Sequence, residues 1–144
     1  MALYPAFLKL DGLRVVVVGG GPVAAGKLDG LVAAGARVVV IAPYICDEIR
    51  ARADLVTFVA ATHEPSRHHT LDVPRGRILL VERGFLSPDL DGARWVVAAA
   101  PPDVNQQVAA AATARGLFVN AVDDTAAATA YLGGVVRRGE VGIA

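Results

Sequence analysis

The sequence predicts a doubly wound α/β fold, in which a parallel β-sheet carries helices on both faces. Residues 14–18 (RVVVV) form an unbroken run dominated by β-branched side chains, as strands do when both of their faces are buried. Further apolar runs of strand length alternate along the chain with alanine-rich stretches of helical period, which is the pattern of βαβ units. The length allows residues 1–144 to form one domain with its own core.

The first βαβ unit is expected between residues 14 and 42. Behind the first strand, apolar residues recur at the spacing of a helix that lies on a sheet: Ala24, Leu28, Leu31 and Val32. Gly35 can adopt the left-handed conformation that ends such a helix. Residues 37–42 (RVVVIA) then predict the second strand.

A second unit is expected towards the end of the chain. Residues 93–100 (ARWVVAAA) predict a strand, residues 101–116 a helix, and residues 117–122 (LFVNAV) another strand. Asp103 is expected to cap the helix in a capping box with Gln106. The buried stripe of this helix and the glycine that ends it are expected at Val104, Val108, Ala111, Ala112 and Gly116.

Two regions outside these units have weaker patterns. Between the units, only residues 78–81 predict a strand, and we interpret residues 61–77 as a surface excursion. The excursion holds all the histidines, His63, His68 and His69, but neighbouring histidines rarely bind one ion and no i, i+4 pair is present, so we expect no metal site. Residues 130–144 predict a hairpin that turns near Arg138-Gly139.

Composition excludes several classes of protein. Fourteen basic and fourteen acidic residues give a formal net charge of zero, which argues against a nucleic-acid partner. No apolar run reaches the roughly 20 residues that a membrane span needs, and no basic segment precedes the apolar amino terminus, so we expect a cytoplasmic protein without a membrane partner. Cys46 is the only cysteine, which excludes an internal disulfide, and we expect it to be packed rather than reactive.

Three glycines at the end of the first strand give the strongest functional signal. Gly19, Gly21 and Ala24 match the pattern G-x-G-x-x-G/A at a strand-to-helix turn. In this pattern the first glycine permits the tight turn, the second lets the backbone approach a pyrophosphate, and the third small residue keeps helix and strand close. Pro22 suits the first helical turn. We therefore predict a Rossmann-like NAD(P)-binding domain, the alternative being an ordinary tight βα turn.

The end of the second strand lacks one expected feature. An acidic residue there normally binds the adenosine ribose, but this chain has Ala42, Pro43 and Tyr44. Ribose recognition must then come from backbone groups or from Tyr44. No arginine at this strand end offers a partner to a 2′-phosphate, so we expect NAD, although the strand end alone does not decide between NAD and NADP.

Two segments carry a resemblance to a known family, YPAFLKLDGLRVVVVGGGPVAAGKLDGLVAAGARVVVIAP and VNQQVAAAATARGLFVNAVDD. They resemble the N-terminal module of siroheme synthase, the precorrin-2 dehydrogenase and sirohydrochlorin ferrochelatase family. The resemblance implies NAD-dependent oxidation of precorrin-2 to sirohydrochlorin, with insertion of ferrous iron as a second reaction in bifunctional members and a homodimer as one assembly. Compared with the family, we expect a segment near 57–77 to be an insertion, and we expect the helical dimerisation domain that follows in the family to be absent from this chain of 144 residues.

The resemblance also assigns site residues. It identifies Asp123, which closes the motif N-x-V-D, as the acid/base residue. Cofactor contacts at the glycine turn and the second strand end are expected from Gly19, Gly20, Gly21, Pro22, Val23, Pro43 and Tyr44. A carboxylate past the carboxyl end of a parallel strand lies beside the crevice that binds the cofactor, where a base is needed to accept a proton.

The neighbouring residues leave alternatives open. Asp124 is adjacent, but in extended backbone neighbouring side chains point to opposite faces, so only one of the two aspartates can face the crevice. Both could instead simply begin a loop. Asn105 is expected at a helix start, and Asn120 is expected to brace the loop that carries Asp123. Candidate partners for the carboxylates of a tetrapyrrole are Lys27, Arg115, Arg137 and Arg138.

Two other functions compete with the enzyme. A nucleotide-sensing regulatory module would share the glycine turn without chemistry, but such modules usually carry the ribose acid that is missing here. A degenerate paralogue would keep the fold as an interaction surface. Oxidation of precorrin-2 coupled to reduction of NAD distinguishes the enzyme from both.

Overall fold

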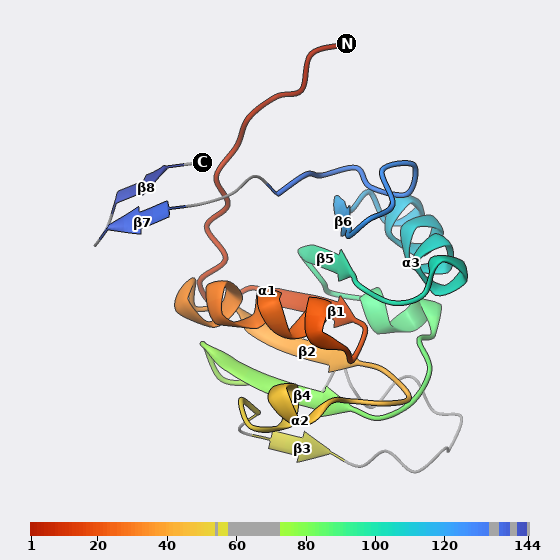
Figure 1. The fold of residues 1–144 in the computed structure, drawn as a ribbon. Helices are drawn as coiled ribbons and strands as arrows, with labels where there is room; N and C mark the ends of the chain where they lie inside the picture. Colours follow the sequence, from red (N-terminus) through yellow and green to blue (C-terminus); the bar gives the residue numbers. More distant parts are fainter. Residues whose placement is uncertain (54, 58–72, 133–135, 139–140, 144) are drawn as a thin grey trace.

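The computed structural model describes residues 1–53, 55–57, 73–132, 136–138 and 141–143. Within these ranges the chain forms a six-stranded sheet and a separate two-stranded sheet (Figure 1). The elements are β1 (Arg14–Val18), α1 (Pro22–Ala33), β2 (Arg37–Ile41), α2 (Asp47–Arg50), β3 (Leu55–Thr57), β4 (Arg77–Val81), the 3-10 helix η2 (Ser87–Leu90), β5 (Trp95–Ala98), α3 (Pro102–Ala114), β6 (Val119–Ala121), β7 (Val136–Arg138) and β8 (Val141–Ile143).

The strand order of the large sheet shows where the chain stops adding strands on one side of β1 and starts adding them on the other. Its order is β3-β4-β2-β1-β5-β6, and every neighbouring pair is parallel. The chain first builds outward from β1 through β2 to β3 and β4, and then returns to the other side of β1 to add β5 and β6. The topological switch point therefore lies between the carboxyl ends of β1 and β5, where open α/β sheets bind their ligands.

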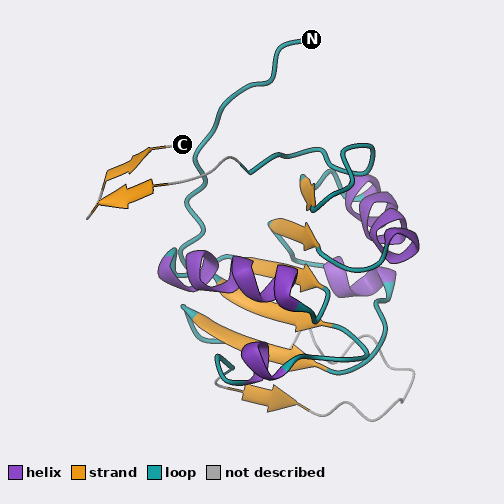
Figure 2. Ribbon diagram, viewed as in Figure 1, coloured by secondary structure: helices purple, strands orange, loops and turns teal. Residues whose placement is uncertain are grey.

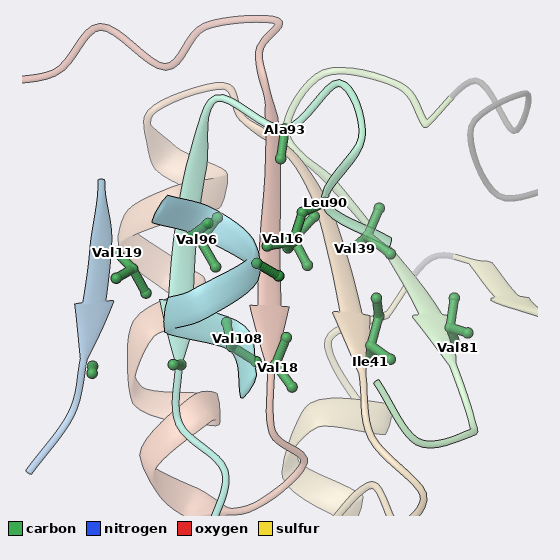
Figure 3. Packing of buried hydrophobic residues seen from close by; sticks show 14 of the residues in the cluster. Val16, Val18, Val39, Ile41, Val81, Leu90, Ala93, Val96, Val108 and Val119 are labelled. Atoms are coloured by element: carbon green, nitrogen blue, oxygen red, sulfur yellow. The ribbon is translucent and has the colours of Figure 1, made fainter. Parts of the chain in front are cut away.

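Helices cover both faces of this sheet, which confirms the doubly wound architecture (Figure 2). On one face, Leu28 of α1 and Ile49 of α2 pack with Val15 and Val17 of β1. On the other face, Val16 and Val18 pack with side chains from α3 and η2, as Figure 3 shows for Val108 and Leu90. Since Val15 to Val18 are at most 2% exposed, β1 is buried on both faces, as its unbroken run of valines predicts.

The predicted long elements are confirmed within a few residues, and both glycine stops are left-handed. Gly35 has φ +75° and Gly116 has φ +66°. The expected capping box is wrong, because α3 begins at Pro102 and no side chain caps it. The fixed φ of two consecutive prolines starts the helix before Asp103, which lies in the first turn instead of at the cap.

The region between the two units differs in part from the prediction. Val73 is 4% exposed and belongs to the same core cluster as Val108 of α3, and Arg77 begins β4, so the predicted surface excursion over residues 61–77 is wrong at these two positions. Residues 58–72, with the three histidines, lie outside the described residues. The short elements α2, β3 and η2 were not predicted. The late hairpin is confirmed by the antiparallel pair of β7 and β8, although residues 139–140 between them lie outside the described ranges.

Among the helices of the described ranges, none combines the length and the apolar character that crossing a bilayer requires.

Candidate functional site

Two of the three glycines after β1 are closely packed against neighbouring chain, whereas the third is not. Gly19 has φ +136°, and a Cβ there would lie only 2.6 Å from the carbonyl carbon of Ala99. A Cβ on Gly20 would lie 2.9 Å from the Cβ of Ala42 and would overlap the carbonyl oxygen of Tyr44. Beside Gly21, by contrast, no atom of the described residues lies within 4 Å of the position of a Cβ. The first two glycines are therefore required by packing, whereas the third leaves its backbone open to an approaching ligand.

The amino end of α1 faces the same opening. Gly21 is its extended N-cap residue, Pro22 is its first residue, and no side chain caps the helix. The first N–H groups of a helix have no intrahelical partner, and they carry the positive end of its dipole. Val23, which provides one of these groups, is 46% exposed. This end of α1 can therefore bind an anion such as a diphosphate.

The loop after β2 is fastened to the glycine turn. The N–H of Cys46 donates to the carbonyl oxygen of Gly20 at 2.8 Å, and the N–H of Gly19 donates to Ile41 at 2.9 Å. Pro43 and Tyr44 are exposed between these two bonds, and Tyr44 keeps 77% of its surface accessible. The structure thus brings the seven predicted cofactor residues together at one edge of the sheet.

On the other side of the glycine turn lies the loop from β5 to α3. Its backbone at Ala99 is the group that leaves no room for a side chain on Gly19. Asn105 is only 3% exposed, and its Oδ1 accepts the N–H of Ala100 at 2.9 Å. This amide holds the loop against the turn across the switch point. Sequence reasoning expected only a polar residue at a helix start, and nothing in the local pattern distinguishes the two cases.

Asp123 follows β6 at the same edge. Ala121 pairs with Ala98 of β5, Ala98 pairs with Val18 of β1, and the N–H of Val122 donates to Ala98 at 3.0 Å. Two strand spacings, about 10 Å, therefore separate the ends of β1 and β6. Asp123 is exposed, and at φ +62° it is the only non-glycine residue with positive φ among the described residues. Within those ranges its carboxylate has no hydrogen bond or ion pair.

The two adjacent aspartates differ in their hydrogen bonds, and not, as expected, because they point to opposite faces of a strand. They lie in a turn, not in extended backbone, so strand alternation does not separate them. The Oδ1 of Asp124 accepts the N–H groups of Ala126 and Ala127, each at 3.1 Å, and so stabilises the turn. Asp124 is thereby occupied, and Asp123 is the carboxylate that remains available.

Among the other polar candidates, Asn120 and Arg115 have structural partners. Asn120 is 6% exposed, and its Nδ2 donates to the carbonyl oxygen of Ala130 at 3.1 Å, so it braces the chain at the far end of the loop that carries Asp123. Arg115 forms an ion pair with Asp91 at 2.8 Å and donates to the carbonyl oxygen of Ala111 at 3.0 Å. It therefore links the end of α3 to Asp91. Lys27 is partly exposed on α1.

Two further predictions concern side chains outside the described part of the chain. The side chains of Arg137 and Arg138 are not described, and neither are the three histidines. The described part of the chain has no group of three or more His, Cys, Asp or Glu residues placed to hold a metal ion.

Comparison with known proteins shows that the chain is similar to siroheme synthases. The chain is 40% identical over 128 residues to a siroheme synthase of Chromobacterium violaceum, a match that covers 88% of this chain and 23% of that protein. It is 38% identical over 145 residues to a siroheme synthase of Pseudomonas entomophila, covering 100% of this chain and 27% of that protein. The chain thus spans about a quarter of the length of these relatives.

A solved structure has the same fold. The precorrin-2 dehydrogenase SirC superposes with a TM-score of 0.72 at 22% identity, over 99% of this chain and 60% of that one. The family described as putative NAD(P)-binding matches residues 6–134, which include the glycine turn, the loop after β2 and Asp123. The predicted kinship with siroheme synthases and the predicted Rossmann-like fold are therefore confirmed, and this chain belongs to the putative NAD(P)-binding family.

Proposed function

We propose that this protein oxidises precorrin-2 to sirohydrochlorin with NAD as the hydride acceptor. One observation carries the proposal: the glycine turn after β1 is open to a dinucleotide, and Asp123, an exposed carboxylate with no partner among the described residues, follows β6, whose end lies two strand spacings, roughly 10 Å, from the end of β1. The similarity to siroheme synthases gives the substrate class.

The residues present fit a bound dinucleotide. The open side of Gly21 and the uncapped amino end of α1 would hold the diphosphate. The exposed ring of Tyr44 and the exposed Pro43 would lie against the adenosine half. When bound, NAD supplies the hydride-accepting chemistry that protein side chains lack.

Asp123 would supply the acid/base chemistry. Oxidation removes a hydride from one carbon and a proton from a neighbouring position, so a base must accept that proton. The carboxylate of Asp123 can do so because no cation or N–H group occupies it within the described ranges. Asp124 is the less suitable base, because its Oδ1 already accepts the N–H groups of Ala126 and Ala127.

The replacement of Asp123 by Asn tests the assignment. Asn tolerates the left-handed backbone at this position about as well as Asp, so the fold should remain intact. We expect NADH formation from precorrin-2 and NAD to fall by about 100-fold or more, in line with the loss of a general base, while the dissociation constant for NAD changes less than threefold. Asp124→Asn is the matched control and should retain most of the turnover.

The same experiment separates this function from the alternatives. Wild-type protein that binds NAD but neither binds nor oxidises a tetrapyrrole would support a regulatory module. Turnover that survives in Asp123→Asn would refute the role of Asp123. Insertion of ferrous iron and a homodimer stay predictions of the resemblance, and iron would enter such a reaction as a substrate. The cytoplasmic location stays a prediction from the sequence pattern.

A further inference from the structure

Glu82 occupies the position next to the missing ribose acid. β2 ends at Ile41, which pairs with Val81 at the end of β4, and the N–H of Ala42 donates to the carbonyl oxygen of Val81 at 3.2 Å. Glu82 is the first residue after β4. An acid therefore stands one strand away from Ala42, at the same level of the carboxyl edge, where sequence order alone would not find it.

The carboxylate of Glu82 lies on the face of the sheet that α1 and α2 cover. Its Oε1 is buried and forms an ion pair with Nη2 of Arg50, which belongs to α2. The side chain of Glu82 keeps 19% of its surface exposed, and that of Arg50 keeps 36%. The pair is thus shielded on one side and accessible on the other, as a group that contacts a ligand needs to be.

Arg50 links this pair to the glycine turn. Its Nε donates to the carbonyl oxygen of Ile45 at 3.2 Å. The next residue, Cys46, donates its N–H to Gly20 at 2.8 Å. A chain of contacts therefore runs from Glu82 through Arg50 and the loop at Ile45 to the glycine turn, and the exposed Tyr44 directly precedes Ile45. The end of β2 is the side of the crevice where the adenosine ribose of a dinucleotide lies.

We propose that Glu82, held by Arg50, reads the 2′ position of the adenosine ribose and selects NAD over NADP. This inference rests on the proposed function only in that the site binds a nicotinamide dinucleotide. A carboxylate accepts a hydrogen bond from the 2′-hydroxyl of NAD and repels the 2′-phosphate of NADP. Arg50 is bound by Glu82 and Ile45, so it does not offer its charge to that phosphate.

Two substitutions should change the selectivity in opposite directions. In Glu82→Gln the Arg50 guanidinium loses its anion and becomes able to bind a 2′-phosphate, so we expect the ratio of the dissociation constants for NADP and NAD to fall at least tenfold. In Arg50→Met the uncompensated carboxylate should raise that ratio. Isothermal titration of the full 144-residue chain with NAD and with NADP measures both ratios.

Glu48→Gln is the matched control. Glu48 lies on the same short helix but pairs with Arg52 at 3.4 Å, so its replacement should leave the ratio unchanged. Circular dichroism checks the fold of each variant, and Glu82→Asp, which keeps the charge, should keep the preference for NAD if Glu82→Gln does not fold.

The outcomes are distinct. A folded Glu82→Gln variant whose ratio stays within twofold of wild type would overturn the role of Glu82 and leave the proposed function intact. Wild-type protein that prefers NADP would do the same. Failure of the wild-type chain to bind either nucleotide would overturn both the proposed function and this inference.

Discussion

At the scale of single residues, the glycine turn separates fold from function. Gly20 is required because its backbone lies against the loop after β2, whereas Gly21 has open space beside it. The motif specifies glycine at position 21 but any residue at position 20, so the need for glycine at position 20 becomes visible only in the packing. The two glycines should therefore respond differently to the same small substitution.

We predict that Gly20→Ala destabilises the protein and that Gly21→Ala impairs binding. The methyl group on residue 20 would overlap the Tyr44 carbonyl, so the backbone must move, at a cost of about 1–3 kcal/mol in the free energy of unfolding. The methyl group on residue 21 meets no protein atom, but it stands where a diphosphate must approach. Urea denaturation should show near-wild-type stability for Gly21→Ala, and titration should show at least tenfold weaker NAD binding.

Gly26 provides the control for both variants. It lies inside α1, and a Cβ there also meets nothing within 4 Å. Replacing it with alanine should stabilise the protein by about 0.5–1 kcal/mol, because glycine is unfavourable in a helix interior, and should not change NAD binding. Unchanged NAD affinity in Gly21→Ala would show that the opening beside this glycine does not receive the cofactor.

At the scale of elements, a buried ion pair holds the segment between β4 and β5. Asp89 of η2 is completely buried, and its two oxygens accept hydrogen bonds from Arg83 at 2.6 and 2.8 Å. The same carboxylate accepts the N–H of Leu86 at 2.8 Å. Burial lowers the pKa of Arg14, and the charges of Asp89 and Asp91 oppose that shift. Asp89 therefore compensates two guanidinium groups at once.

We predict that Asp89→Ala lowers the free energy of unfolding by about 3 kcal/mol, because it leaves the buried guanidinium of Arg83 without its counterion. Asp29→Ala is the matched control: it removes the exposed partner of Arg52 and should leave the urea midpoint almost unchanged. If both variants shifted the midpoint equally, the buried pair would have no special role in stability.

The elements that the sequence predicts are the long strands and helices, whose pattern of apolar residues follows from their burial in the sheet or against it. β1 and β2 read as strands because the sheet buries both of their faces, and α1 reads as a helix because one stripe is apolar. Short elements depend on distant partners instead. η2 is held by Arg83 through Asp89, and α2 by the burial of Ile49, so neither has a local pattern of its own. The capping box failed because Pro102 starts α3 earlier than the pattern suggests.

At the scale of the whole molecule, the strand order assembles the candidate site. The glycine turn is visible in the sequence because one continuous segment forms it, and the role of Asp123 was predicted from a resemblance and stays a prediction. The contact of Asn105 with the loop after β5 and the position of Glu82 beside the end of β2 were not predicted, because they exist only once β5 lies beside β1 and β4 beside β2. Residues from both halves of the fold thus meet at the switch point.

This arrangement predicts that bound NAD slows amide hydrogen exchange in both halves of the fold. A dinucleotide that crosses the switch point contacts the turn after β1, the loop after β2 and the loop after β5, so amide hydrogen exchange should slow in residues 19–25, 43–46 and 99–105. At 100 times its dissociation constant, NAD should also raise the free energy of unfolding by about 2.7 kcal/mol.

Residues 10–14 and 35–37, at the opposite edge of the sheet, provide the internal control, because β1 and β2 both begin there and their carboxyl ends face the crevice. Their exchange should slow only by as much as the global stabilisation requires. Protection confined to residues 19–25 and 43–46 would mean that the ligand occupies the β2 side alone and does not reach the loop after β5. In that case Asp123, which follows β6 beyond β5, would be too distant to act on a substrate at the nicotinamide.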